Sequence, residues 1–318
     1  MGKTKTRPKR RSARRPVQAP RHRAEPQRWS RSTLAWGAVI ALTCLGLLAA
    51  AFLLGKRDAQ GGSEGPASAT GGLPDTPDYH SLLVAPGDPG HILLGTHAGL
   101  YESTDGGRDW KRTALAGQDA MNLARGDGEI VWTAGHNVFA KSTDDGRSWS
   151  EVRPDGLPSL DLHGFVVDPR DGSLWAAVAG EGLYRSSDGG VSFEVVSREV
   201  GGAVMALAIT PAGRLLAGDM ERGLLSSEND GRTWRVALPA AVMGLAINPA
   251  DPDVVVAGGP GILRSSDGGE TWDVSLSLDP GAGPVAWSAS DTEVGYAVGF
   301  DRVLYRTGDR GLSWQPLS

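Results

Sequence analysis

Short apolar segments separated by polar turns dominate the chain from residue 78 to the C-terminus. Within several of them apolar and small side chains alternate, for example in 205–209 and 243–247. Such alternation with a period of two predicts β-strands that turn one face towards a core. Segments such as 82–85 are followed by turns rich in Pro and Asp, after which a further apolar segment begins. The pattern therefore predicts an all-β domain made of many short strands.

An eight-residue pattern close to Ser-x-Asp-x-Gly-x-Thr-Trp occurs six times in this region, and successive copies end 39, 44, 41, 38 and 42 residues apart. Asn229 replaces the Asp in one copy, and Phe193 replaces the Trp in another. Ser and Asp side chains cap backbone N–H groups in tight turns, and Gly allows positive φ. Each copy is therefore predicted to be a hairpin turn between two outer strands. The copies are 103–110, 142–149, 186–193, 227–234, 265–272 and 307–314.

The spacing of these copies determines the predicted architecture. A repeat near 40 residues indicates stacked supersecondary units in place of one ordinary core. Each unit contains one pair of apolar strands and one hairpin, which gives four strands. Six four-stranded units that close into a ring form a six-bladed β-propeller, predicted here for residues 78–318.

The repeated pattern resembles the Asp box, or bacterial neuraminidase repeat, of sialidases, sortilin-type receptors and photosystem II assembly-factor propellers. The resemblance covers about residues 78–318 and implies that the boxes are structural and lie away from the functional face. It implies either a module that binds or assembles proteins, or an exo-sialidase-like glycosyl hydrolase. The segment 161–164, Asp-Leu-His-Gly, is similar to blade starts in bacterial propellers labelled glycosyl hydrolases. The chain lacks the Arg-Ile-Pro segment of sialidases, which favours the binding module over an enzyme.

The N-terminal part has a different composition. Residues 1–33 carry 12 Lys or Arg and one acidic residue, and residues 34–55 are uncharged and mostly apolar. Such a run spans a bilayer core of about 30 Å as a helix, with the basic tail on the cytoplasmic side. We therefore expect a single-pass cell-membrane anchor, a flexible linker at 56–77 and an extracytoplasmic propeller. The alternative is a signal peptide cleaved near 49–51, although the apolar run is long for one and continues past that point.

The charge of the remaining chain limits its partners. Residues 58–318 contain 18 basic and 36 acidic residues. A strongly acidic domain disfavours DNA or anionic lipid, so no nucleic acid is expected as a partner. A protein or glycan ligand on the open face of the propeller remains compatible with this charge.

Two positions in each blade are expected at one end of the ring, opposite the repeated turns. The first is the start of the innermost strand, and the second precedes each repeated turn by six residues. Four of the six His residues of the chain occupy these positions, all in blades one to three. In blade order the first position holds His80, Met121, His163, Met205, Met243 and Val285, and the second holds His97, His136, Gly180, Glu221, Gly259 and Asp301.

These residues suggest two kinds of chemistry. Imidazole with thioether suits copper, especially Cu(I), whereas imidazole alone also suits zinc or nickel. We therefore predict a metal site, with copper as the first candidate, at His80, His97, His136, His163 and Met121. The competing interpretation is that the His residues are polar lining and that Met fills gaps between blades. For a hydrolase, the candidate carboxylates are Asp78, Asp119, Asp161, Glu221 and Asp301.

Overall fold

The computed structural model of the chain describes residue 2 and residues 72–317. The predicted transmembrane helix at 34–55 lies outside the described residues, as do nearly all of the basic tail and linker residues 56–71. In the part that is described, no helix is long and apolar enough to cross a membrane.

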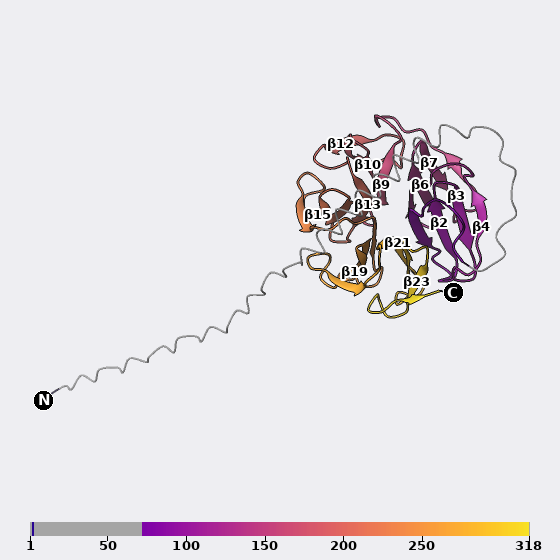
Figure 1. Ribbon diagram of the computed structural model, residues 1–318. Coiled ribbons are helices and arrows are strands. Elements are labelled where there is room, and N and C mark those ends of the chain that lie inside the picture. Colours follow the sequence, from indigo (N-terminus) through magenta and orange to yellow (C-terminus); the bar gives the residue numbers. More distant parts are fainter. Residues whose placement is uncertain (1, 3–71, 318) are drawn as a thin grey trace.

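The described chain is a ring of six four-stranded antiparallel sheets (Figure 1). In every sheet the strand order follows the chain, so each blade consists of four consecutive strands. The predicted all-β, six-bladed propeller with four-stranded blades is confirmed. The strands are β1 (Ser81–Val84), β2 (Ile92–Thr96), β3 (Gly99–Ser103), β4 (Lys111–Ala114), β5 (Asn122–Arg125), β6 (Val131–Gly135), β7 (Val138–Ser142), β8 (Ser150–Glu151), β9 (Leu162–Val167), β10 (Leu174–Val178), β11 (Gly182–Ser186), β12 (Glu194–Ser197), β13 (Val204–Ile209), β14 (Leu215–Asp219), β15 (Gly223–Ser227), β16 (Arg235–Leu238), β17 (Gly244–Ile247), β18 (Val255–Gly259), β19 (Gly261–Ser265), β20 (Asp273–Leu276), β21 (Ala282–Trp287), β22 (Gly295–Gly299), β23 (Leu304–Thr307) and β24 (Gln315–Pro316).

The second strand of each blade forms the centre of the core. Every residue of β2, β6, β10, β14, β18 and β22 is buried, because neighbouring blades cover both faces of these strands. The fourth strands form the outer edge and are mostly exposed. This gradient explains the composition: the second strands are rich in Val, Leu, Ala and Gly, whereas the fourth strands are polar or mixed.

The ring closes by contact between the first and last blades. Strand β1 lies against β21, and the phenol of Tyr296 in β22 donates a hydrogen bond to the carbonyl oxygen of Pro89 at 2.9 Å. Residues 72–77 also contact the ring, since the N–H of Gly72 donates to the carbonyl oxygen of Arg108 at 3.0 Å. Among the described residues, every core cluster lies within the ring, between Leu73 and Leu317.

The repeated eight-residue segments, here called the repeat turns, have the geometry expected from their sequence. In the turn between β19 and β20, the Ser265 hydroxyl donates to Asp267 Oδ1 at 2.7 Å and accepts the N–H of Gly269 at 2.9 Å. Asp267 Oδ1 also accepts the N–H of Thr271 at 2.9 Å. The indole of Trp272 donates to the Gly269 carbonyl oxygen at 3.1 Å, and Gly269 has a φ of +90°. The predicted hairpin turn is confirmed.

Candidate functional site

The propeller brings the four predicted His residues to one end of the ring. His80 directly precedes β1, and His163 is the second residue of β9. His97 lies in the connection between β2 and β3, and His136 lies in the connection between β6 and β7. Innermost strands start at the end of the ring to which second strands return, so the two sets of His residues meet there.

Close backbone contact between blades allows the side chains to touch. A Cβ atom on Gly95 would lie 2.2 Å from the carbonyl oxygen of Ala120, so only Gly fits at this junction of blades one and two. The N–H of Ala120 donates to the Thr96 carbonyl oxygen at 3.1 Å. At the next junction, the N–H of Asn137 donates to the Leu160 carbonyl oxygen at 2.8 Å. These contacts place His97 beside Asp119 and His136 beside Asp161, and each of these Asp residues begins the following blade.

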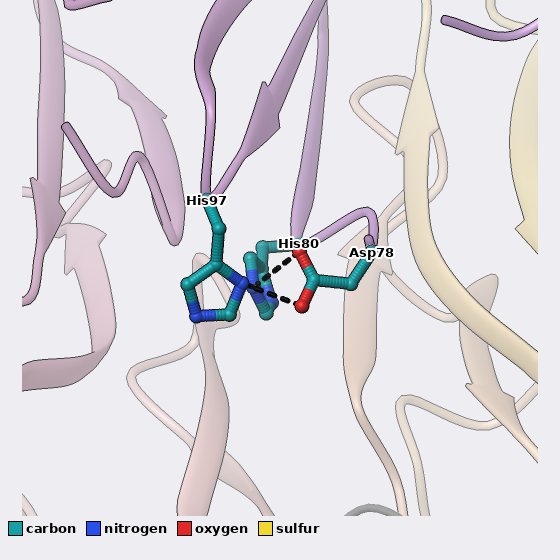
Figure 2. Close-up of side chains that lie close together, drawn as sticks. All are labelled: Asp78, His80 and His97. Atoms are coloured by element: carbon teal, nitrogen blue, oxygen red, sulfur yellow. Dashed lines mark hydrogen bonds and ion pairs between the residues drawn. The ribbon is translucent and has the colours of Figure 1, made fainter. Parts of the chain in front are cut away.

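The first group of side chains comes from blade one (Figure 2). His97 Nδ1 lies 2.5 Å from Asp78 Oδ2 and 2.7 Å from His80 Nε2. His80 Nε2 also lies 3.2 Å from Asp78 Oδ1, which is buried but makes no hydrogen bond with any described residue. Two imidazole nitrogens and one carboxylate therefore face one another.

Asp119 lies between His97 and His136. Its Oδ2 is 3.1 Å from His97 Nε2 and also makes a short contact with His136 Nδ1. The side chain is only 8% exposed, and its Oδ1 makes no hydrogen bond in the described part of the chain. Asp119 thus connects blades one and two through a single carboxylate oxygen.

A third group joins blades two and three. His136 Nε2 is 3.0 Å from His163 Nε2 and 3.2 Å from Asp161 Oδ1. The distance from His163 Nε2 to the same Asp161 oxygen is 3.1 Å. These three groups form a continuous row of three carboxylates and four imidazoles, which we call the funnel cluster; its members are Asp78, His80, His97, Asp119, His136, Asp161 and His163.

Hydrogen bonds to the carboxylates favour the protonated form of two imidazoles in the funnel cluster. Burial opposes protonation of His97, but hydrogen bonds to Asp119 and Asp78 outweigh it and raise the pKa of the ring to about 10. The hydrogen bond to Asp119 raises the pKa of His136. Burial alone would raise the pKa of Asp119, yet His136 and His97 lower it to about 2. Among the described residues, the ion pairs of the cluster's carboxylates are all with His and none is with Lys or Arg.

Met121 lies in an apolar environment, unlike the row of imidazoles and carboxylates. It is buried in an apolar cluster with Met205, Met220 and Ala241, against which Met243 also packs. Met121, Met205 and Met243 line a cavity of about 70 Å³ together with His80. These methionines, at or just before the starts of the innermost strands, therefore lie close together, and His80 belongs to the funnel cluster and also lines this cavity.

Two of the five candidate carboxylates stand outside the cluster. Glu221 is exposed in the β14–β15 connection of blade four. Asp301, in blade six, accepts a hydrogen bond from the Tyr305 phenol at 2.6 Å, and this contact, together with burial, raises the pKa of Tyr305 to about 12. Asp78, Asp119 and Asp161 are the three that the fold brings together.

Sequence reasoning missed Asn122, which holds two blades together beneath the cluster. Its side-chain amide donates to the carbonyl oxygens of Leu162 and His163 at 3.2 and 3.1 Å, and its oxygen accepts the N–H of Phe165 at 3.2 Å. Asn122 is buried in β5, and these bonds fix the start of β9 and hence His163. The available signal was a polar residue at the start of an innermost strand, directly after Met121.

Comparison with known proteins supports the predicted resemblance. Residues 82–223 match the family model described as "Photosynthesis system II assembly factor YCF48". This match runs from β1 into β15 and includes most of the funnel cluster. A comparison with curated proteins found no matching sequence.

Several solved structures share the fold. YCF48 bound to D1 peptide is 20% identical, with a TM-score of 0.51 and coverage of 81% of this chain and 87% of that chain. The GH74 xyloglucanase from Xanthomonas campestris is 18% identical, with a TM-score of 0.56 and coverage of 80% of this chain; the match spans only 46% of the xyloglucanase. A putative gluconolactonase has a TM-score of 0.58 at 12% identity, with coverage of 80% and 92%. The chain thus resembles both assembly-factor propellers and glycosyl hydrolase propellers, as its repeats predicted.

Proposed function

We propose that this chain is a membrane-anchored, extracytoplasmic binding module whose ligand site is the funnel cluster, and that the cluster binds a metal ion. The observation that carries this proposal is the continuous contact of four imidazoles and three carboxylates at one end of the propeller. Asp119 is buried and Asp78 is partly buried, and among the described residues the neighbouring imidazoles are the groups that can balance their charge. A metal cation would displace protons from the imidazole nitrogens and would bind the neighbouring carboxylate oxygens directly.

Copper remains the first ion to test, with zinc as the alternative. Imidazole nitrogen suits both ions, and carboxylate oxygen is compatible with Cu(II) and Zn(II). The thioether sulfur of Met121 would provide a soft ligand near His80, since both residues line one cavity. Of the cluster's carboxylates, Asp161 is the most exposed and lies nearest solvent, so an ion there stays open to a further ligand.

The partner that we propose is a protein segment bound on the same face. The YCF48 structure bound to D1 peptide shows that another propeller of this fold binds a peptide. The basic tail and the apolar run 34–55 would hold the module at the cell membrane, with the propeller outside. In this proposal the six repeat turns are Asp boxes that stabilise the blades and take no part in binding.

A glycosyl hydrolase is the second candidate, favoured by the similarity to the GH74 xyloglucanase and by the three neighbouring carboxylates. Glycoside hydrolysis needs one carboxyl group that stays protonated, with a raised pKa. The pKa values of Asp78, Asp119 and Asp161 are all lowered, because each carboxylate accepts hydrogen bonds from His. This electrostatic pattern suits ligand or cation binding better than general acid catalysis.

Metal content tests the proposal. The propeller, residues 72–318, is expressed without a His tag, and bound copper, zinc and nickel are measured beside a His80→Gln/His163→Gln variant. We expect metal in the wild type and at least a tenfold lower content in the variant. Equal, negligible content in both after exposure to each ion would contradict the proposal. Protease digestion of intact spheroplasts tests the topology, since only an extracytoplasmic propeller is degraded.

A further inference from the structure

We propose that the funnel cluster holds two separate metal sites, each made of two imidazole nitrogens and one carboxylate, with Asp119 as a shared positioning residue between them. This inference rests on the proposed metal binding and adds its stoichiometry, its ligand sets and the class of ion. The first site would be His136, His163 and Asp161, and the second would be Asp78, His80 and His97.

The site at blades two and three already has the spacing of a coordination sphere. His136 Nε2, His163 Nε2 and Asp161 Oδ1 form a nearly equilateral triangle with sides of 3.0, 3.1 and 3.2 Å. Metal–ligand bonds of about 2.0–2.1 Å place adjacent ligands about 2.8–3.4 Å apart in octahedral or tetrahedral geometry. One ion therefore fits above this triangle with little movement of the side chains. The Asp161 side chain is 43% exposed, which leaves the other side of the ion open to water.

The site at blade one has the same composition. His80 Nε2 lies 2.7 Å from His97 Nδ1 and 3.2 Å from Asp78 Oδ1, and His97 Nδ1 lies 2.5 Å from the other oxygen of Asp78 (Figure 2). The shorter distances are those of hydrogen bonds, so an ion would separate His97 from Asp78 and His80. Asp78 Oδ1 is buried and makes no hydrogen bond among the described residues, and it would gain a partner.

The orientations of the His97 and His136 rings explain why we propose two sites and why Asp119 forms a bridge between them. His97 directs Nδ1 to Asp78 and His80, and it directs Nε2 to Asp119. His136 directs Nε2 to Asp161 and His163, and it directs Nδ1 to Asp119. Each ring thus has one nitrogen for an ion and one N–H for Asp119, the arrangement in which a carboxylate orients a metal-binding imidazole.

A single ion held by all four imidazoles does not fit this geometry. No group of potential ligands among the described residues contains both His80 and His163. The rings of His97 and His136 stack with centroids 5.9 Å apart, and Met121 takes the inner-strand position that His holds in the flanking blades. Two nitrogens and one oxygen suit borderline divalent ions such as Zn²⁺, Co²⁺ or Cu²⁺.

Binding stoichiometry tests this inference. The metal-free propeller is titrated with Co²⁺, whose visible absorption reports nitrogen and oxygen coordination, and bound Zn²⁺ is then counted by native mass spectrometry. We expect two ions on the wild type, one on Asp161→Asn/His163→Gln, one on Asp78→Asn/His80→Gln and none on the combined variant. Glu221→Gln changes the exposed carboxylate at the equivalent connection in blade four and serves as the matched control, which keeps two ions.

The outcomes separate this inference from the function on which it rests. One ion on the wild type, lost completely in either half-variant, would show a single shared site and overturn the two-site inference while metal binding stands. No ion on a folded wild type would overturn both. Circular dichroism of each variant checks the fold, and because Asn and Gln keep the size and polarity of the groups that they replace, loss of an ion reports on the ligands.

Discussion

The two ends of the propeller follow different rules. At the end with the repeat turns, the same side chains make the same bonds in blade after blade, as shown by Ser142 with Asp144 and Ser265 with Asp267 at 2.7 Å each. At the funnel end, equivalent backbone positions carry different residues. The Asp of Asp119 is replaced by Ala203 in blade four and by Ala241 in blade five. What repeats is what a blade needs to fold, and what differs between blades is free to serve a specific function.

The difference within the funnel strengthens this conclusion. Blades four and five fill their inner positions with Ala and Met, which pack as an apolar cluster. At the same end, blades one to three carry carboxylates and imidazoles that are partly buried or, for Asp119, buried, although burial of charged groups opposes folding unless they are paired. Because blades four and five fold with apolar residues at these positions, the polar residues of blades one to three are explained better by a role in binding than by a role in stability.

The largest expected effect comes from removing an aromatic residue of a repeat turn. Trp272 is buried, so Trp272→Ala should lower the free energy of unfolding by about 3–5 kcal/mol. Denaturant unfolding measures this loss, and Val274→Ala on the exposed strand β20 is the control. The folded fraction should bind metal as the wild type does, and a selective loss of binding would place the turns in the site.

A smaller effect is expected when the funnel of blade two is made like that of blades four and five. Asp119→Ala removes the carboxylate that orients His97 and His136, so metal affinity should fall by about 10–100-fold. The propeller should still form, since Ala is the native residue at this position in two other blades. Competition with a chelator measures the affinity, and an unchanged affinity would mean that Asp119 positions nothing.

A single turn carboxylate should matter less. Asp267→Ala removes acceptors for the hydroxyls of Ser265 and Thr271 and for backbone N–H groups, which should cost about 1 kcal/mol of stability. Asp267→Asn should cost less, because Asn229 accepts the corresponding bonds from the Ser227 hydroxyl and the Thr233 N–H in its own turn. If Asp267→Ala left stability intact but abolished metal binding, the division between the two ends of the molecule would be wrong.

The smallest expected effect is an acid-dependent one. Hydrogen bonds from Ser148 and Ser192 lower the pKa of Asp144 and Asp188 to about 2, from 3.8. A lowered folded-state pKa gives stability that is present above pH 4 and is lost as pH falls towards 2. Asp144→Asn/Asp188→Asn should therefore flatten the decline in thermal midpoint between pH 4 and pH 2. An identical decline in the variant would show that these carboxylates do not contribute.

The sequence was sufficient for the blades and for the positions of the funnel residues. Turn residues and strand alternation depend only on residues that are close in the sequence. Because the pattern repeats, strands identified in one blade could be assigned at the equivalent positions of the next. The contacts inside the funnel cluster could not be predicted from the sequence. The direction in which the ring nitrogens of His97 and His136 point depends on how closely neighbouring blades approach at Gly95 and Asn137. The burial of Met121 among other methionines likewise depends on contacts between blades that are distant in the sequence.

Competition titration with copper tests the central claim most directly. The metal-free propeller and its His80→Gln/His163→Gln variant are titrated with Cu(I) and with Cu(II) against a chelator of known affinity. The account predicts that the wild type takes copper from the chelator, whereas the folded variant leaves it there. Equal and weak binding by both proteins would show that these His residues are ordinary polar lining and would contradict metal binding at the funnel.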